Sequence, residues 1–267
     1  DSFKGIDIAL FAGGSISKDF APHAVKAGAV VIDNSSAFRM DPEVPLVVPE
    51  VNPQAILKHK GIIANPNCST IIMVMALKPI YDLAKIKRVI VSTYQAVSGA
   101  GKEGIDELDA QVRDHSEGRE MTANILPSAS AEKHYPIAFN LIPQIDVFCD
   151  NLYTKEEMKM VNETKKIMED YEMRITATTI RVPVYRSHSE SVNIELEKEV
   201  DLGAMREALA KFPGVTVQDD PSKQEYPMPL YTSEKDDVYV GRLRRDESCE
   251  KSYNIWVVGD QIRKGAA

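Results

Sequence analysis

The 267-residue sequence contains little cysteine, few aromatic residues and no excess of basic charge. Its three cysteines, Cys68, Cys149 and Cys249, are too few and too widely spaced for a disulfide scaffold or a zinc site. Lysine and arginine together number 32, against 40 aspartates and glutamates, and the net charge of −8 argues against a nucleic-acid partner. No apolar run reaches the roughly 18 residues that a membrane span needs, and no signal peptide is evident. We therefore expect a cytoplasmic protein with no membrane partner.

The sequence also lacks an initial methionine and the G-x-G-x-x-G turn that usually opens a dinucleotide-binding sheet. It starts at Asp1, directly before an apolar strand, and it ends in a run of small residues at 264–267 where a helix is expected to begin. We interpret the chain as a fragment that lacks its first β-α-β units, with the dinucleotide-binding turn, and its last helix.

Apolar strands and helical segments alternate over residues 1–67, which predicts a parallel sheet with right-handed crossovers. The strands are expected at 6–11, 30–32 and 61–64, with a helix over 22–28. The polar run at 33–36 follows a strand, so it should lie at the carboxyl edge of the sheet, where open α/β sheets bind ligands.

The remainder of the chain predicts a second, partly antiparallel α+β domain. A buried helix starting near Ser69 should end before Lys85, and a helix over 154–172 should have Thr154 as its N-cap. Further segments are a helix over 102–113, an irregular excursion over 115–135 and strands at 87–94, 174–184, 189–197, 237–243 and 253–258. The last strand is expected to return to the first domain. We therefore assign 1–67 and 247–267 to the first domain and 68–246 to the second.

Cys68 lies in a polar turn between a predicted strand and a predicted helix. A thiol reacts as its thiolate, and the unpaired N–H groups and partial positive charge of a helix N-terminus should lower the pKa of such a thiol. The same N–H groups can hold an oxyanion. We predict that Cys68 is a covalent nucleophile, whereas Cys149 and Cys249 are expected to be small buried hydrophobic residues.

Three motifs follow one another along the chain: Asn-Cys-Ser-Thr at 67–70, Gln-Ala-Val-Ser-Gly-Ala-Gly at 95–101, and Arg181 followed by His-Ser-Glu-Ser at 188–191. With them the sequence resembles the aspartate-β-semialdehyde dehydrogenase family, and most closely its Gram-positive-type bacterial branch. Further similar segments at 33–40, 48–52, 142–146, 156–160 and 218–221 extend the resemblance over almost the whole chain. The resemblance implies that the first domain, 1–67 and 247–267, is a truncated Rossmann-like parallel sheet and a partial NADP-binding domain. It implies that the second, 68–246, is an α+β catalytic and dimerisation domain of the glyceraldehyde-3-phosphate-dehydrogenase type.

The resemblance implies that Cys68 forms a thioester and that His188 is the general acid and base, a role that suits an imidazole with a pKa near 6.5. Gln95 is implied to orient the substrate or the thioester carbonyl. Arg181 is implied to clamp the substrate carboxylate with its planar guanidinium. Since Arg181 precedes His188 by seven residues, an odd offset along a strand, we expect a bend between them. The other four histidines are expected to be surface or core residues.

The resemblance also implies a phosphate site and an amino-group site. Arg39, Asn67 and Lys159 are the implied phosphate-binding residues. Glu156 is implied to face the substrate amino group, although a solvated Glu/Lys face of the helix explains Glu156 and Lys159 nearly as well. The implied NADP contacts are Gly13, Ser35, Ser36, Ser98, Gly99 and Gln261, and no metal is implied. The chain is one small residue shorter than its relatives before Gly13, so the loop there is expected to shift.

The implied reaction is the NADP-dependent reductive dephosphorylation of L-aspartyl 4-phosphate to L-aspartate 4-semialdehyde, or its reverse, within the biosynthesis of lysine, diaminopimelate, threonine and methionine. Partners are then a small substrate, phosphate and a second copy of the chain, as a homodimer or homotetramer. Two alternatives remain open. One is an N-acetyl-glutamyl-phosphate reductase with the same Cys and His chemistry, and the other is a catalytically inert fragment that only dimerises.

Overall fold

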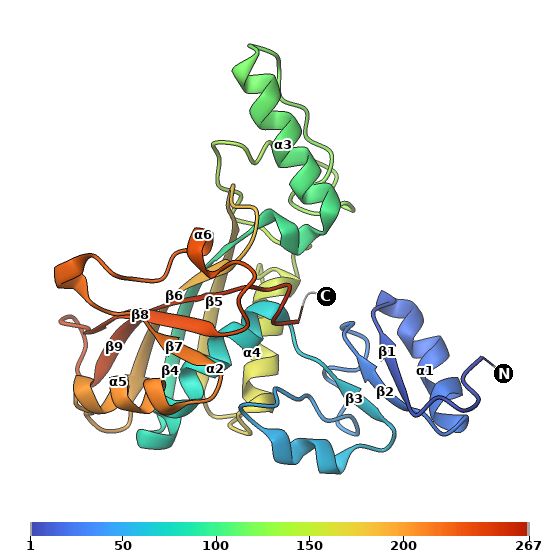
Figure 1. The fold of residues 1–267 in the computed structure, drawn as a ribbon, viewed down its shortest axis with the longest axis horizontal. Helices are drawn as coiled ribbons and strands as arrows, with labels where there is room; N and C mark the ends of the chain where they lie inside the picture. The colour runs from blue at the N-terminus through green and yellow to red at the C-terminus, as the bar shows by residue number, and fades with distance from the viewer. Residues whose placement is uncertain (1, 266–267) are drawn as a thin grey trace.

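The computed structural model describes residues 2–265, in which the chain forms two β-sheets (Figure 1). The predicted start of a C-terminal helix at 264–267 falls partly outside these residues. The smaller sheet has the order β1-β2-β3 and consists of Ile8–Phe11, Val30–Asp33 and Ile62–Ala64. All of its strands are parallel, as predicted.

One helix, α1 (Ser17–Lys26), connects β1 to β2. It begins five residues before the predicted start, and Pro22 lies inside it. Ala21 and Ala24 are fully buried. Their packing against the small sheet explains why the helix continues through a proline that would be unfavourable in isolation. Gly28, with φ +100°, provides the left-handed turn into β2.

The larger sheet has six strands in the order β5-β4-β6-β9-β8-β7. Their bounds are Ile86–Gln95 for β4, Arg174–Arg181 for β5, His188–Leu196 for β6, Val215–Val217 for β7, Val238–Arg245 for β8 and Ser252–Gly259 for β9. The β4·β5 and β7·β8 pairs are parallel and the other pairs are antiparallel, which confirms the predicted mixed character.

The predicted return of the last strand to the first domain is wrong, because β9 hydrogen-bonds between β6 and β8. Its residues Ile255 and Val257 are buried in the main core, and this packing fixes the strand in the larger sheet. The chain reaches the smaller-sheet region only after Gly259, where Lys264 Nζ lies 2.8 Å from a carboxylate oxygen of Glu50.

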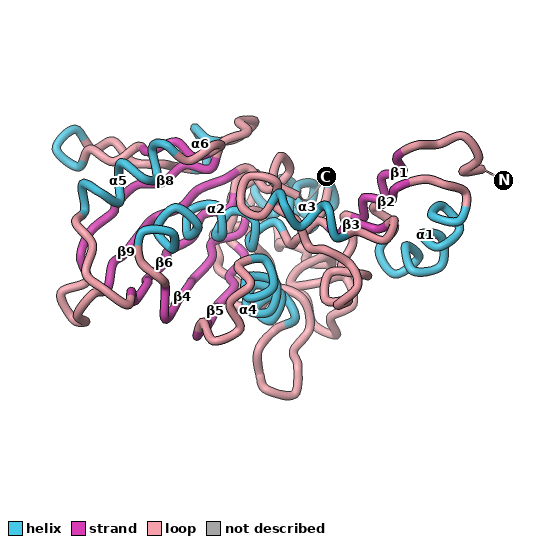
Figure 2. The backbone as a smooth tube through the Cα atoms, turned by 90° about the horizontal axis from the view of Figure 1, so that it is seen from below, coloured by secondary structure: helices cyan, strands magenta, loops and turns pink. Residues whose placement is uncertain are grey.

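Three helices cover one face of the larger sheet: α2 (Cys68–Leu83), α4 (Lys155–Ile167) and α5 (Leu202–Lys211). Figure 2 shows α2 between the other two, and α2 packs against both. Every residue from Ser69 to Leu77 in α2 is buried, which agrees with its continuous apolar sequence. Helix α5 and strand β7 were not predicted, because each is short and its apolar pattern is weak.

Helix α3 (Lys102–Ser116) and the irregular segment after it project away from the larger sheet around a small core of their own (Figure 1). The remaining elements are α6 (Pro229–Thr232) and four short 3-10 helices, η1 (Gly14–Ile16), η2 (Pro53–Lys58), η3 (Val97–Ala100) and η4 (Pro221–Lys223). Among the described residues, no helix combines the length and apolar character required to span a bilayer.

The position of α4 is fixed at its start. Thr154 and Glu157 form a reciprocal capping box, and the other oxygen of Glu157 accepts a 3.0 Å hydrogen bond from the backbone N–H of Thr179 in β5. The helix ends at Ile167, five residues before the predicted end, and Glu169 then adopts a left-handed φ of 51°. The N-cap prediction is thereby confirmed and the predicted C-terminus is wrong.

Candidate active site

Cys68 is the first residue of α2, at the turn that connects β3 to this helix. Asn67 is the N-cap, and its Oδ1 accepts a 3.2 Å hydrogen bond from the backbone N–H of Thr70. The Sγ atom of Cys68 lies 3.6 Å from Nε2 of His188. The chain therefore places a thiol beside an imidazole at a helix N-terminus, as the sequence predicts.

The helix N-terminus acts on the Cys68 thiol in the predicted direction, since the backbone N–H of Ser69 lowers its pKa, but this effect does not determine the net shift. Burial, with the nearby carboxylate of Glu156, raises the pKa of Cys68 to about 12. The backbone N–H of Ser69 and the guanidinium groups of Arg181 and Arg39 act in the opposite direction but are outweighed. The thiol thus needs a further change in its surroundings before it ionises readily at neutral pH.

His188 and Arg181 lie on opposite sides of β4. Arg181 ends β5 opposite Gln95, and His188 begins β6, which pairs with β4 on the other edge. The chain leaves the sheet between them and turns at Ser187, with φ 71°. The predicted bend is present, and it moves the chain to a different strand, so the face rule for a single strand does not apply.

The backbone of Ala96, directly after β4, contacts both of these side chains. Its N–H donates a 3.0 Å hydrogen bond to Nδ1 of His188, and its carbonyl oxygen accepts a 2.7 Å hydrogen bond from Arg181. Burial lowers the pKa of His188 well below 6.5, and the Arg181 guanidinium lowers it further. His188 is therefore neutral at physiological pH, and its pKa is lower than the expected value near 6.5.

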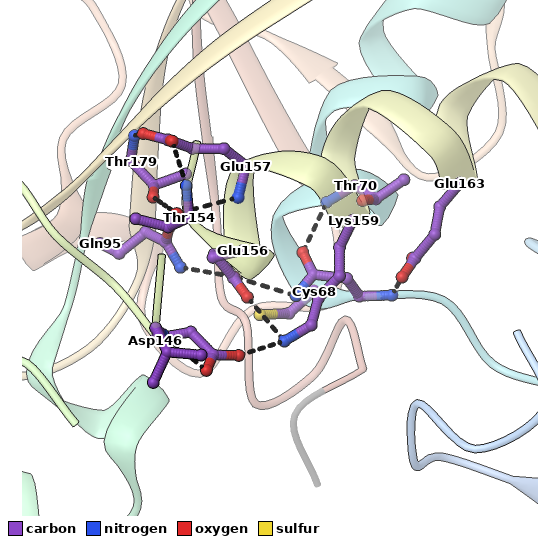
Figure 3. Close-up of polar contacts among 12 residues, drawn as sticks. Cys68, Thr70, Gln95, Asp146, Thr154, Glu156, Glu157, Lys159, Glu163 and Thr179 are labelled. Carbon is purple, nitrogen blue, oxygen red and sulfur yellow. Dashed lines mark hydrogen bonds and ion pairs between the residues drawn. The ribbon is translucent and has the colours of Figure 1, made fainter. Parts of the chain in front are cut away.

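The exposed-face alternative for Glu156 does not hold, because the residue is only 6% exposed. Its Oε1 accepts a 2.9 Å hydrogen bond from Nδ2 of Asn67. It also accepts a 3.2 Å hydrogen bond from Nε2 of Gln95, which lies near Glu156 in Figure 3. Its Oε2 lies 3.2 Å from Nζ of Lys159. Burial alone would raise the pKa of Glu156, but Lys159 and these hydrogen bonds outweigh burial and lower it, so the carboxylate is ionised.

Two acidic residues that the sequence did not single out belong to the same cluster. Glu163 lies about two helical turns after Glu156 on α4. It accepts a 2.6 Å hydrogen bond from the backbone N–H of Asn67 and pairs with Arg39 at 3.2 Å. Asp146 pairs with Lys159 at 3.1 Å. The seven-residue spacing from Glu156 could have identified Glu163, since such positions share a helix face.

The three residues predicted to bind phosphate surround the turn at Cys68, and all of them already have partners. Arg39 donates to the carbonyl oxygens of Asn65, at 2.9 Å, and Asn34, at 3.0 Å, in addition to its ion pair with Glu163. Lys159 is shared between two carboxylates. An incoming anion would therefore compete with carboxylates for these cations.

The six residues predicted to contact NADP fall into two groups. Ser98, Gly99 and Gln261 lie close to His188: Gln261 donates to Ser98, and a Cβ on Gly99 would lie 3.1 Å from the His188 ring. Gly13, Ser35 and Ser36 belong to loops that follow β1 and β2.

A cleft of about 440 Å³ opens at the carboxyl ends of the small parallel sheet. Phe11, Ala12, Asn34, Asn65 and Lys264 are among its lining residues. This is the edge at which open α/β sheets bind dinucleotides, so the architecture fits such a cofactor. Within residues 2–265, no cluster of three or more histidine, cysteine, aspartate or glutamate side chains could hold a metal ion.

Comparison with known proteins agrees with this architecture. The model of the semialdehyde dehydrogenase NAD-binding domain matches residues 1–59, and that of the semialdehyde dehydrogenase dimerisation domain matches residues 77–264. The chain is 58% identical over 270 residues to an aspartate-semialdehyde dehydrogenase of Aquifex aeolicus and 54% identical over 269 residues to that of Bacillus subtilis, with 100% of this chain and 78% of each relative covered.

A solved structure of aspartate semialdehyde dehydrogenase II from Vibrio cholerae superposes with a TM-score of 0.92 at 46% identity, covering 98% of this chain and 77% of the other. The same enzyme complexed with ASA matches equally well over 98% of this chain and 76% of that one. These similarities extend over both sheets and over the turn that carries Cys68. The chain therefore belongs to the aspartate-semialdehyde dehydrogenase family.

Proposed function

We propose that the chain interconverts L-aspartyl 4-phosphate and L-aspartate 4-semialdehyde with NADP as cofactor, and that Cys68 carries the acyl group as a thioester. The observation that carries this proposal is the 3.6 Å approach of Cys68 Sγ to His188 Nε2 within one cluster of polar side chains. The names of the relatives from Aquifex aeolicus and Bacillus subtilis support the same substrate.

The roles of the side chains follow from their geometry. In the oxidative direction the Cys68 thiol loses its proton and the sulfur bonds to the aldehyde carbon, which gives a thiohemiacetal. Loss of a hydride from this carbon to the oxidised cofactor would leave the thioester, and attack of phosphate on the thioester then releases the sulfur as thiolate. Arg181 binds the substrate carboxylate, since its Nε has no hydrogen-bond partner among the described residues and the guanidinium keeps donors to spare. Arg39, Asn67 and Lys159 bind the phosphate group.

The cofactor would be held by Ser98, Gly99 and Gln261 near His188, and by the loops that contain Gly13, Ser35 and Ser36. When bound, NADP supplies the hydride acceptor for oxidation of the Cys68-bound substrate. Gly99 has no side chain, and a Cβ there would lie 2.7 Å from Arg181, so its backbone can approach the reacting groups closely.

Glu156 connects substrate choice to thiol reactivity. Its carboxylate raises the pKa of Cys68, so a substrate ammonium group beside Glu156 would offset that charge and favour the thiolate. The acetamide of an N-acetylated substrate carries no charge and would leave the effect of Glu156 in place. This difference favours aspartate semialdehyde over the longer N-acetyl-glutamate analogue.

Rates with the two semialdehydes, measured with phosphate and NADP⁺, test the proposal. We expect faster turnover of aspartate semialdehyde, dependence on phosphate, and a lower rate when NAD⁺ replaces NADP⁺. Faster turnover of the N-acetyl compound would contradict the substrate assignment. A chain that binds no NADPH by fluorescence and shows no turnover would support the inert alternative.

We propose further that the chain assembles as a homodimer or homotetramer through the domain that contains the larger sheet. The match of residues 77–264 to a dimerisation domain supports this assembly. Light scattering at several protein concentrations distinguishes a dimer from a tetramer, and a monomer at all concentrations would contradict the proposal.

A further inference from the structure

Ala96 is a small residue at the end of β4, and its side chain makes no polar contact. Its backbone, however, lies between the two strands that deliver His188 and Arg181, and it contacts both side chains. The residue is fully buried, so its N–H has no access to solvent as a second hydrogen-bond partner.

The hydrogen bond from this N–H determines how the imidazole is oriented. Nδ1 of His188 lies 3.0 Å from the Ala96 nitrogen, and an imidazole nitrogen that accepts a hydrogen bond carries no proton. If the ring were flipped by 180°, a carbon would face the amide and a buried N–H would be unpaired. The contact therefore favours one ring orientation and one tautomer.

The opposite tautomer can be compared with this one directly. It would place Nδ1–H against the Ala96 N–H at 3.0 Å, two donors facing each other with a rigid backbone on one side. The favoured tautomer places Nε2–H near Nε2 of Gln95 at the longer distance of 3.4 Å. Gln95 can direct one hydrogen to Glu156, which lies 3.2 Å away, so this second approach is the less unfavourable one.

We propose that the backbone N–H of Ala96 is a positioning group that holds neutral His188 with its proton on Nε2, so that His188 presents a hydrogen-bond donor to the Cys68 sulfur. This inference deepens the proposed function and rests on it for its catalytic meaning. His188 then cannot take the thiol proton at Nε2 while the Ala96 contact is intact. It can donate to a thiolate, or to an oxygen that develops on the bound substrate.

The N–H group at Nε2 of His188 lies beside a second N–H donor, the side-chain amide of Gln95. Nε2 of Gln95 and Nε2 of His188 are 3.4 Å apart, and the Cys68 sulfur lies 3.6 Å from the latter. Two N–H donors side by side next to a nucleophile can share one oxygen acceptor. With the proton on Nε2, His188 and Gln95 can therefore both donate to the carbonyl oxygen of the acyl group bound to Cys68.

The charged and titratable groups that face His188 support a neutral ring. Arg181 from β5 is cationic, and it disfavours a second positive charge on the imidazole. Cys68 from α2 is a neutral thiol at physiological pH, and Glu156 from α4 already accepts hydrogen bonds from Asn67, Gln95 and Lys159. An imidazolium would also bring a proton on Nδ1 against the Ala96 N–H.

Long-range ¹H–¹⁵N spectra of the full chain labelled with ¹⁵N-histidine test the tautomer without any assay of activity. The signals of His188 are identified by their loss in His188→Asn. We expect Nδ1 in the range of an unprotonated nitrogen and Nε2 in the range of a protonated one, with no change between about pH 8 and pH 5. The signals of His23 and His115, both exposed, are followed in the same spectra as an internal comparison.

A second experiment removes only the donor. Replacing the amide between Gln95 and Ala96 with an ester, by incorporating lactic acid at position 96, eliminates the N–H and keeps the methyl group and the following carbonyl. We expect a mixture of tautomers, onset of His188 protonation at a higher pH, and a kcat reduced toward that of His188→Asn. Ala96→Gly keeps the N–H and should retain the parent spectrum.

A proton on Nδ1 in the parent protein, or an ester variant whose His188 spectrum and pH profile equal those of the parent, would overturn the assignment. Because the spectra are recorded on resting protein, that failure is distinguishable from a failure of the proposed function. In the latter case the tautomer would be as described but turnover of aspartate semialdehyde would be absent.

Discussion

The Cys68 sulfur and Nε2 of His188 lie 3.6 Å apart although 120 residues separate them in the chain. The first residue of α2 and the first residue of β6 meet there, so each side chain is fixed by the start of a regular element. The contact requires the larger sheet and its covering helix to be packed correctly. Activity therefore serves as a sensitive measure of that packing.

Cys68→Ser should reduce phosphate-dependent oxidation of aspartate semialdehyde to background, because a serine hydroxyl ionises far less readily than a thiol. The rate of NADPH formation is the measurement. Cys249→Ser, at an exposed position, is the matched control and should retain the parental rate. Parental activity in Cys68→Ser would refute the nucleophile assignment.

Arg181→Lys should raise KM for aspartate semialdehyde by roughly 10- to 100-fold, with a smaller change in kcat. A lysine ammonium lacks the planar fork that can contact the Ala96 carbonyl and a substrate carboxylate together, and hydrogen bonds to charged groups contribute about 1.5–3 kcal/mol. Steady-state kinetics measure the two parameters. Arg174→Lys, at the exposed start of the same strand, should leave both unchanged, and an unchanged KM in Arg181→Lys would exclude the clamp.

Glu156→Gln should lower the pKa of Cys68, since the Glu156 carboxylate is the second cause of its rise after burial. A lower pKa gives a larger thiolate fraction at any pH below it, so Cys68 should be alkylated by iodoacetamide faster at pH 8. Mass spectrometry of the Cys68 peptide follows the reaction, and Glu103→Gln on the exposed side of α3 serves as control. Slower alkylation of Glu156→Gln than of the control would contradict the predicted sign.

The burial of the Glu190 carboxyl predicts that the free energy of unfolding depends on pH. It is fully buried in β6, neither carboxyl oxygen has a partner among residues 2–265, and burial raises its pKa well above 4.5. The folded state thus retains a proton that the unfolded state releases above about pH 4.5. The contribution of the Glu190 carboxyl to folding stability is fully present below about pH 4.5. It falls by about 1.4 kcal/mol per pH unit above that pH and is lost once the pH has risen through the folded-state pKa.

Glu190→Gln should remove this loss, because a glutamine does not titrate. Urea unfolding gives the free energy of unfolding of the parent and of Glu190→Gln at pH 5 and at pH 8. We expect this free energy to fall more between the two pH values in the parent than in Glu190→Gln. Glu247→Gln, on an exposed turn, should behave like the parent. Equal changes in the parent and in Glu190→Gln would show that Glu190 finds a partner or solvent when it ionises.

The sequence predicted the small parallel sheet, the mixed character of the larger sheet, and the turn that carries Cys68. These features follow from local signals: short apolar strands, a capping box at Thr154, and a polar turn before an apolar helix. It also named the side chains that gather around Cys68, through their resemblance to ordered motifs.

Apart from helix ends, such as the C-terminus of α4, the predictions that the structure corrects concern non-local properties. The neighbours of β9 depend on which strands the whole chain leaves available, and the sequence of this strand does not encode them. The pKa values of Cys68 and His188 depend on burial and on Arg181 and Glu156, which are distant in sequence. Glu163 and Asp146 were missed because an acidic residue on a helix or in a loop carries no local sign of burial.

The polar face of α4 consists of residues 156, 159 and 163, and through it one helix contacts the turn before Cys68 and Arg39 and presents Lys159. Successive residues of a helix are rotated by about 100°. Insertion or deletion of a single residue between Thr154 and Glu163 would therefore turn part of this face away from the pocket, whereas length changes in the irregular segment after α3 would leave it intact. Insertions and deletions among natural relatives should accordingly avoid the first two turns of α4.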